Sequence, residues 1–76
     1  MELNEFVQLF AEQFEETPAS EFTKDTKFRD LDEWSSLLAL SIISMVDEEF
    51  DVSLNAEDMK KSQTVEDIYN AVQAKR

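Results

Sequence analysis

Apolar residues near the start of the chain recur at the spacing of an amphipathic α-helix. They are Leu3, Phe6, Val7, Phe10 and Phe14. Positions three or four residues apart share one face of a helix, so the pattern predicts a first helix of roughly four turns. Because the residue before a proline avoids helical backbone angles, we expect this helix to end at Thr17 and Pro18. Its phenylalanines indicate core packing rather than chemistry.

The following segment, residues 18–34, is mostly polar and shows no sustained periodicity. It predicts a long loop with a turn of helix near residues 27–31, held to the core by irregularly spaced apolar residues. These anchors are Phe22, Phe28, Leu31 and Trp34. Long loops in small domains are often functional. We expect this loop to deliver Ser35 and Ser36 to the start of a second helix.

The second helix is predicted from about Ser36 to Asp51. Ser35 suits the N-cap position, where a hydroxyl accepts a backbone N–H from the first turn. Trp34 and Ala39 stand at the two positions of a hydrophobic staple. The residues expected to face the core are Ala39, Ile42, Ile43, Val46 and Phe50.

A different stripe of this helix carries Leu37, Leu40, Ser41, Ser44 and Glu48. Single exposed leucines are common on protein surfaces and need no explanation. Two leucines within one turn beside a helix start, rimmed by acidic residues, instead favour a contact patch.

The last third of the chain predicts a short helix and a longer one. Asn55 can cap a brief helix that runs through Lys61 with Met59 turned inward. Thr64 and Asp67 then resemble a capping box, and the apolar face that follows is made of Val65, Ile68, Tyr69 and Val72. The fold class is therefore all-α: a small bundle of three main helices plus one short helix, with a long first loop, in one domain spanning residues 1–76.

The composition excludes several kinds of chemistry. The 76 residues include no cysteine, histidine or glycine. Thiol redox chemistry, thiolate metal sites and the commonest general base are therefore absent, as are the glycine loops that hold nucleotide phosphates. The lack of cysteine is compatible with a reducing cytoplasm. We expect neither a secretory signal nor a membrane span.

The net charge is −11, and its distribution is uneven. Nine acidic residues and no Lys or Arg lie between Asp30 and Asp58. Such a segment repels nucleic acid and anionic membranes, whereas it attracts a partner with a basic surface. Simple solubility is the alternative explanation.

Ser35 and Ser36 are compatible with two interpretations, a modification site or a pair of helix caps. No acid pair has the apolar frame that would separate two carboxyl pKa values, and no metal-binding loop matches a calcium pattern. Ser36 is a weak nucleophile without a base beside it, but it suits modification by another enzyme, because an attached phosphate would face the positive end of a helix. Otherwise both serines are merely helix caps.

Several segments resemble the acyl carrier proteins of the phosphopantetheine-binding superfamily. They are residues 28–31 (Phe-Arg-Asp-Leu), 34–37 (Trp-Ser-Ser-Leu), 46–54 (Val-Asp-Glu-Glu-Phe-Asp-Val-Ser-Leu) and 64–68 (Thr-Val-Glu-Asp-Ile). The resemblance extends over nearly the whole chain. It implies that Ser36 carries 4′-phosphopantetheine, donated by coenzyme A. The family usually has Asp where this chain has Ser35. Ser41 and Ser44 also depart from the family pattern, which implies a set of partners narrower than, or different from, that of a general fatty-acid system.

The function implied by the resemblance is to carry acyl intermediates as thioesters for fatty-acid, polyketide or related acyl biosynthesis, without enzymatic activity. The implied partners are a phosphopantetheinyl transferase and acyl-loading and acyl-processing enzymes with basic docking patches, and the protein is expected to be a cytoplasmic monomer. The expected docking surface is Leu37, Leu40, Asp47 and Glu48. The expected acyl pocket is Phe28, Ala39, Ile43, Val46, Met59 and Ile68. The alternatives are a peptidyl or aminoacyl carrier, such as a D-alanyl carrier, and an unmodified acidic interaction module.

Overall fold

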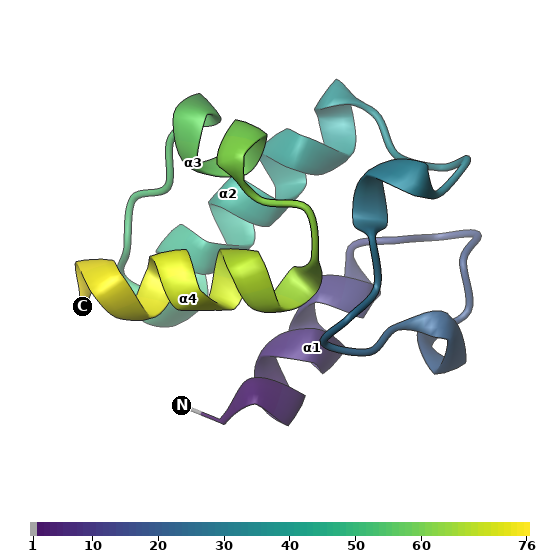
Figure 1. The fold of residues 1–76 in the computed structure, drawn as a ribbon, viewed down its shortest axis with the longest axis horizontal. Coiled ribbons are helices and arrows are strands. Elements are labelled where there is room, and N and C mark those ends of the chain that lie inside the picture. Colours follow the sequence, from purple (N-terminus) through teal and green to yellow (C-terminus); the bar gives the residue numbers. More distant parts are fainter. Residues whose placement is uncertain (1) are drawn as a thin grey trace.

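The computed structural model describes residues 2–76 and contains four α-helices joined by loops (Figure 1). The helices are α1 (Leu3–Glu12), α2 (Ser36–Phe50), α3 (Ala56–Lys61) and α4 (Val65–Lys75). Two short 3₁₀ turns, η1 (Ala19–Glu21) and η2 (Phe28–Asp30), lie in the long connection between α1 and α2. The all-α prediction is therefore confirmed, with three longer helices and one short one.

Helix α1 ends at Glu12, so the predicted end at Thr17 and Pro18 was wrong. The backbone N–H groups of Glu15 to Thr17 donate to a side chain outside the helix, the carboxylate of Glu33. Amides that bond to this carboxylate do not bond to the carbonyls one turn earlier, so the helix cannot continue through them. Phe14 is nevertheless buried, as its place in the apolar pattern predicted.

The long loop is attached to the N-terminus of α4. Val65 donates its N–H to the carbonyl of Thr26 at 3.2 Å, and Glu66 donates to the carbonyl of Lys24 at 2.9 Å. The first amides of a helix have no partner within it, so the loop satisfies two that α4 leaves free. The turn predicted near residues 27–31 is present as η2, whereas η1 was not predicted.

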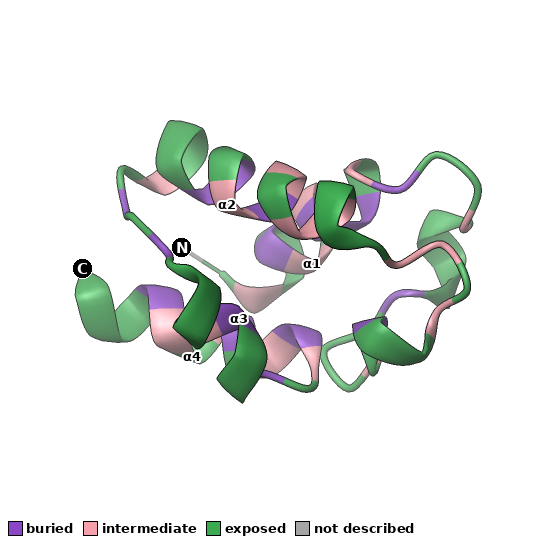
Figure 2. Cartoon of the chain, turned by 90° about the horizontal axis from the view of Figure 1, so that it is seen from above, coloured by how far each residue is buried: buried purple, intermediate pink, exposed green. Residues whose placement is uncertain are grey.

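Side chains from all four helices and from the long loop form one core. Figure 2 marks where the buried residues lie along the chain. Phe10 lies at its centre, with four other phenylalanine rings around it at centroid distances of 5.5–6.3 Å. On α2 the buried residues are Ile42, Met45 and Val46. Met45 was not predicted to face inward, and three of the predicted residues, Ala39, Ile43 and Phe50, are only half-buried. The buried stripe of α2 is therefore rotated relative to the prediction.

The caps predicted for the last two helices are confirmed. Asn55 and Asp58 form a reciprocal capping box at the start of α3, and Thr64 and Asp67 form another at the start of α4. Met59 is buried, as expected. Within residues 2–76, no helix is both long enough and apolar enough to cross a membrane.

Candidate functional site

The junction between the long loop and α2 is held by the ring of Trp34. This ring lies 4.6 Å from that of Phe28 and 6.2 Å from that of Phe14, measured between centroids. Phe28 is fully buried and Phe14 nearly so. Two core residues from different segments therefore fix the residue that comes just before the two serines.

Glu33 supplies a second attachment of the junction, to the chain that follows α1. Its carboxylate accepts hydrogen bonds from the backbone N–H groups of Glu15, Glu16 and Thr17 at 2.9–3.2 Å. The hydroxyl of Thr17 donates a further bond at 2.8 Å. Partial burial tends to raise the pKa of this carboxyl, but the hydrogen bonds together hold its pKa below the ordinary value.

The two serines at the junction have different surroundings. Ser35 has extended backbone angles and is the N-cap of α2, where its Oγ accepts the N–H of Leu38 at 3.4 Å. Ser36 is the first residue of the helix and is exposed. Its Oγ makes no hydrogen bond with any residue between Glu2 and Arg76. The cap prediction for Ser35 is confirmed, and Ser36 is left with an accessible hydroxyl.

A groove begins at these serines and runs between α2 and α3; we call it the serine groove. It is lined by Arg29, Trp34, Ser35, Ser36, Ala39, Leu40, Ile43, Ala56, Met59 and Lys60. Three residues of the predicted acyl pocket, Ala39, Ile43 and Met59, therefore line one groove with Ser36. The other three do not line it, because Phe28, Val46 and Ile68 are completely or almost completely buried in the core.

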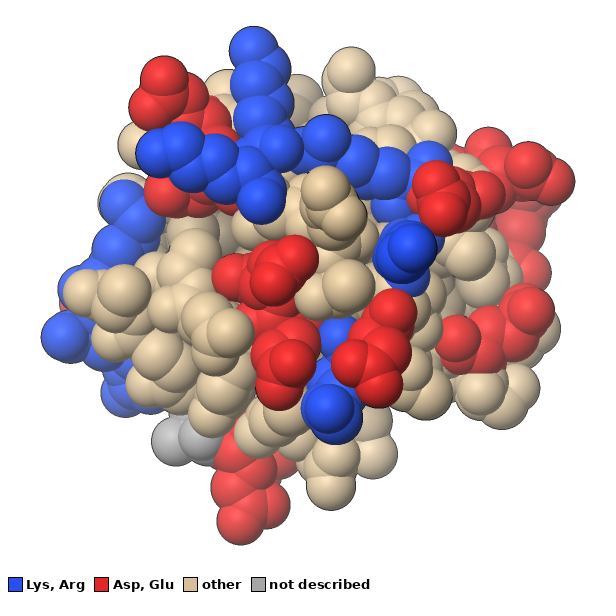
Figure 3. Space-filling model, viewed as in Figure 1, with Lys and Arg blue, Asp and Glu red and all other residues tan. Residues whose placement is uncertain are grey.

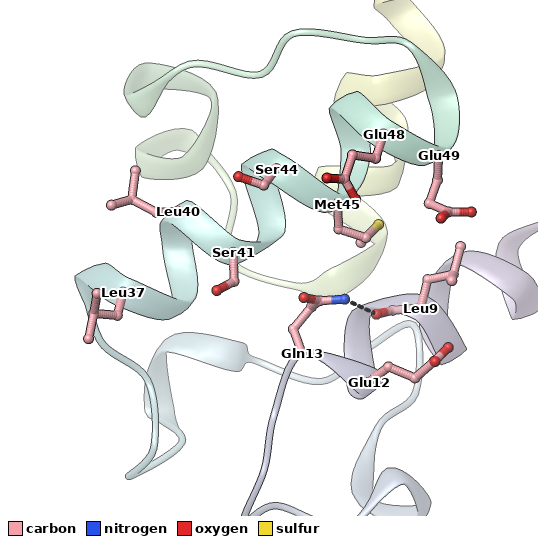
Figure 4. A pocket seen from close by; sticks show the side chains of 10 residues that line it. All are labelled: Leu9, Glu12, Gln13, Leu37, Leu40, Ser41, Ser44, Met45, Glu48 and Glu49. Carbon is pink, nitrogen blue, oxygen red and sulfur yellow. Dashed lines mark hydrogen bonds between the residues drawn. The ribbon is translucent and has the colours of Figure 1, made fainter.

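A second groove lies between α1 and α2 (Figure 4). Its α2 side carries the predicted stripe, with Leu37 and Leu40 near the start of the helix and Glu48 near its end. The leucines are 77% and 60% exposed. Asp47 is exposed but does not line this groove. The α1 side adds Leu9, Glu12 and Gln13, with the Gln13 amide donating to the carbonyl of Leu9 at 3.2 Å.

Charges are distributed unevenly over the surface (Figure 3). Lys and Arg side chains gather over α3 and at the C-terminal end of α4 in that view, whereas α2 carries Asp47, Glu48 and Glu49 and no base. Two of the basic residues, Arg29 and Lys60, lie in the lining of the serine groove. Arg29 also donates to the backbone carbonyl of Met59, which joins η2 to α3. Among residues 2–76, no three acidic side chains are grouped so that they could hold a metal ion.

Several residues that contribute to these sites carry no clear signal in the local sequence. Glu33 was counted only as one acidic residue among nine, and nothing in its local pattern pointed to residues 15–17. Arg29 was quoted only as part of a family segment and Lys60 was not singled out, because the groove is made by segments about thirty residues apart. Leu9 carried a weak signal, because it is apolar but lies off the phenylalanine face of α1.

Comparison with known proteins identifies the family. A family model described as a phosphopantetheine attachment site matches residues 4–72. Comparison with curated proteins found no match, and neither did comparison with solved structures. Because the family model covers most of the chain, the protein belongs to the phosphopantetheine-attachment family and is a carrier of covalently attached 4′-phosphopantetheine.

Proposed function

We propose that Ser36 is the attachment point and that the protein carries acyl chains as thioesters for fatty-acid, polyketide or related acyl biosynthesis. One observation carries this proposal: the exposed Ser36 lies at the end of a groove whose walls include Ala39, Ile43 and Met59. A hydroxyl that is open to an enzyme and also adjoins an apolar groove suits a tethered apolar cargo.

The choice of Ser36 over Ser35 rests on their hydrogen bonds. The Oγ of Ser35 accepts the N–H of Leu38, so its modification would disturb the cap of α2. The Oγ of Ser36 has no such bond within the part of the chain that the structure describes. Modification of Ser36 would therefore leave the start of the helix intact.

The surroundings of Ser36 fit a phosphodiester. The first N–H groups of α2 lack helical partners, and the positive end of the helix dipole favours an anion there by about 0.3–1 kcal/mol. Arg29 and Lys60 add positive charge to the same groove. An anion is therefore accommodated in a chain that is otherwise strongly acidic.

Attachment requires a second protein. Among residues 2–76, no acidic or basic side chain hydrogen-bonds to the Oγ of Ser36, so the base that removes its proton belongs to a phosphopantetheinyl transferase. The attached group supplies the thiol that this chain lacks, and the protein supplies the tether and the surface that partners recognise. We accordingly propose a carrier without catalytic activity of its own.

The serine groove favours an acyl cargo over an aminoacyl one. An alkyl chain that enters it gains roughly 25 cal/mol for each Å² of apolar surface removed from water. A charged amino acid has little apolar surface to bury in the groove, and its charged group would lose favourable hydration there. Phe28, Val46 and Ile68 lie in the core and would have to move apart before a long chain could extend further.

We place partner docking on the stripe of α2 formed by Leu37, Leu40, Asp47 and Glu48. The exposed leucines supply apolar contact, and the acids attract enzymes with basic patches. Once a partner is docked, the tether makes delivery of the cargo intramolecular. We also propose that residues 1–76 act as one monomeric domain in the cytoplasm; the single core supports the first point, and the lack of cysteine is compatible with the compartment.

The test is to incubate the protein with coenzyme A and a broad-specificity transferase and to measure its intact mass. We expect a gain of one phosphopantetheine in the unmutated protein and in Ser35→Ala, and none in Ser36→Ala. If the unmutated protein gains no mass, the carrier proposal is wrong. If the gain survives in Ser36→Ala, the site is elsewhere.

A second measurement separates acyl from aminoacyl cargo. The modified protein is loaded with an octanoyl or an alanyl group, and amide hydrogen exchange is compared at residues 39–43 and 59. We expect the octanoyl form alone to slow exchange along the groove, since burial of the chain stabilises its walls. Equal exchange in the two forms would remove the argument for an acyl cargo.

A further inference from the structure

The carboxylate of Glu33 joins two segments that are far apart in the sequence. It accepts four hydrogen-bond donors from residues 15–17: the amides of Glu15, Glu16 and Thr17 and the hydroxyl of Thr17. A carboxylate has about four acceptor sites, so these donors nearly fill it. We call this arrangement the Glu33 clamp.

The clamp acts on the backbone that leads into α2. Glu33 lies three residues before Ser36, in a stretch that the structure assigns to no helix or strand. The N–H of Trp34 donates to the carbonyl of Leu31 at 3.0 Å, which closes a turn within the stretch but does not join it to another segment. Its attachments to other segments are the contacts of the Trp34 ring with Phe28 and Phe14 and the Glu33 clamp on residues 15–17.

The carboxylate of Glu33 makes no hydrogen bond to Ser36. All the partners of its carboxylate lie in residues 15–17, and it does not line the serine groove. Any effect on the serine hydroxyl must therefore pass through the position of the backbone. The bonds to this carboxylate are also charge-assisted, which makes them stronger than neutral ones.

We propose that Glu33 is a positioning residue for phosphopantetheine attachment, because its clamp on residues 15–17 holds the Oγ of Ser36 where a transferase can use it. This inference rests on the proposed attachment at Ser36. In that reaction the Oγ of Ser36 forms a bond to the phosphorus that carries the pantetheine half of coenzyme A. The pyrophosphate P–O bond breaks, the adenosine bisphosphate half leaves with the electron pair, and the serine proton passes to the transferase.

Such a reaction depends steeply on alignment. A displacement of about 1 Å in a reacting atom can cost on the order of a hundredfold in rate. Release of the clamp would let the junction move while the exposed leucines and acids of α2 stay in place. We therefore expect loss of the clamp to lower the kcat of the transferase for this protein, with little change in KM.

Four variants separate geometry from charge. Glu33→Gln removes the charge and weakens the clamp, and Glu33→Asp keeps the charge but shortens its reach. Thr17→Val removes one donor without altering any charge. Asp32→Asn is the matched control, because it removes one negative charge from the adjacent exposed residue, whose side chain has no hydrogen bond to any residue in the described range.

The experiment measures kcat and KM of a transferase for each variant, after circular dichroism has shown that the variant is folded. We expect Glu33→Gln and Glu33→Asp to lower kcat roughly tenfold or more and Thr17→Val to lower it less. Asp32→Asn should resemble the unmutated protein. In the double variant Thr17→Val/Glu33→Gln the losses should not add, because both substitutions act on one contact.

Trp34 provides an independent readout, because it is the only tryptophan and lies next to Glu33. Its fluorescence emission should shift in the variants that weaken the clamp and stay unchanged in Asp32→Asn. If Glu33→Gln fails to fold, Glu33→Asp and Thr17→Val give the same comparison.

The possible outcomes are distinct. Unchanged kcat in Glu33→Gln and Glu33→Asp, with Ser36 still modified in the unmutated protein, overturns the clamp inference alone. A raised KM in both Glu33→Gln and Asp32→Asn, with Thr17→Val unaffected, also overturns the clamp inference. The transferase would then recognise the negative charges of these residues directly. Absence of modification at Ser36 in the unmutated protein overturns the proposed function itself.

Discussion

Arg29 donates a hydrogen bond from its guanidinium to the backbone carbonyl of Met59 and so joins the long loop to the C-terminal part of α3. The same carbonyl accepts the N–H of Ser62 at 3.2 Å, so the guanidinium is its second donor. The bond reinforces the end of α3, which is only six residues long, and ties one wall of the serine groove to η2.

We predict that Arg29→Gln loosens α3. A hydrogen bond from a charged donor that is partly exposed contributes about 1 kcal/mol, so the free energy of unfolding should fall by that amount in urea titrations. Amide exchange should accelerate in residues 59–62 more than in α1. Lys27→Gln removes the same charge from an exposed neighbour and is the control; equal effects of the two substitutions would show that the bond is unimportant.

The end of α2 offers a second test, because Asp51 has left-handed backbone angles, φ 55° and ψ 41°. A side chain with a Cβ is strained there, and glycine is not. We predict that Asp51→Gly is more stable than Asp51→Ala by about 1 kcal/mol, measured by chemical denaturation. Both variants lose the same charge, so their difference reports on the backbone. If Asp51→Ala proved the more stable, the left-handed conformation would be contradicted.

Acid should weaken the protein through the two capping boxes. The N–H of Asn55 holds the pKa of Asp58 below its ordinary value of 3.8, helped by Lys75, whose Nζ lies 3.2 Å from the carboxylate. The amides of Gln63 and Thr64 likewise lower the pKa of Asp67. A carboxyl whose pKa is lower in the folded state stabilises the fold above its unfolded pKa, and this contribution is lost as the pH falls through the folded value.

We therefore predict that the free energy of unfolding falls as the pH is lowered below about 4. Asp58→Asn and Asp67→Asn should each reduce that dependence, because the titrating group is gone. Urea titrations at about pH 7 and about pH 3 measure it. If the free energy of unfolding had the same pH dependence in both variants as in the unmutated protein, the loss of stability in acid would come from other carboxyl groups.

Glu48 and Glu49 make one end of the groove between α1 and α2 acidic. We therefore predict that partner enzymes with basic patches are attracted to this end by their charge. Glu48→Lys should slow association with a transferase roughly tenfold at low salt, and the difference should shrink as salt screens the charges. Stopped-flow measurements over a range of salt concentrations would show this. Glu21→Lys, an equal change on η1 outside that groove, is the control. An association rate unchanged by Glu48→Lys would remove α2 from the docking surface.

The amino-acid sequence by itself determined the features that depend on neighbouring residues. Helix starts are of this kind, because a cap and the amide that it binds lie within three residues of each other. Ser35, Asn55 and Thr64 therefore marked their helices correctly. The phenylalanine face of α1 was equally clear, since periodicity is a local property. The resemblance, rather than this local pattern, singled out Ser36.

Only the tertiary structure decided the features that join distant segments. Glu33 holds the chain that follows α1 by binding amides 16 to 18 residues away, and no local pattern pairs these residues. The serine groove likewise needs η2, α2 and α3 together. Periodicity shows that α2 has an apolar side, but its neighbours set the rotation that buries Met45 and leaves Ile43 in the groove wall.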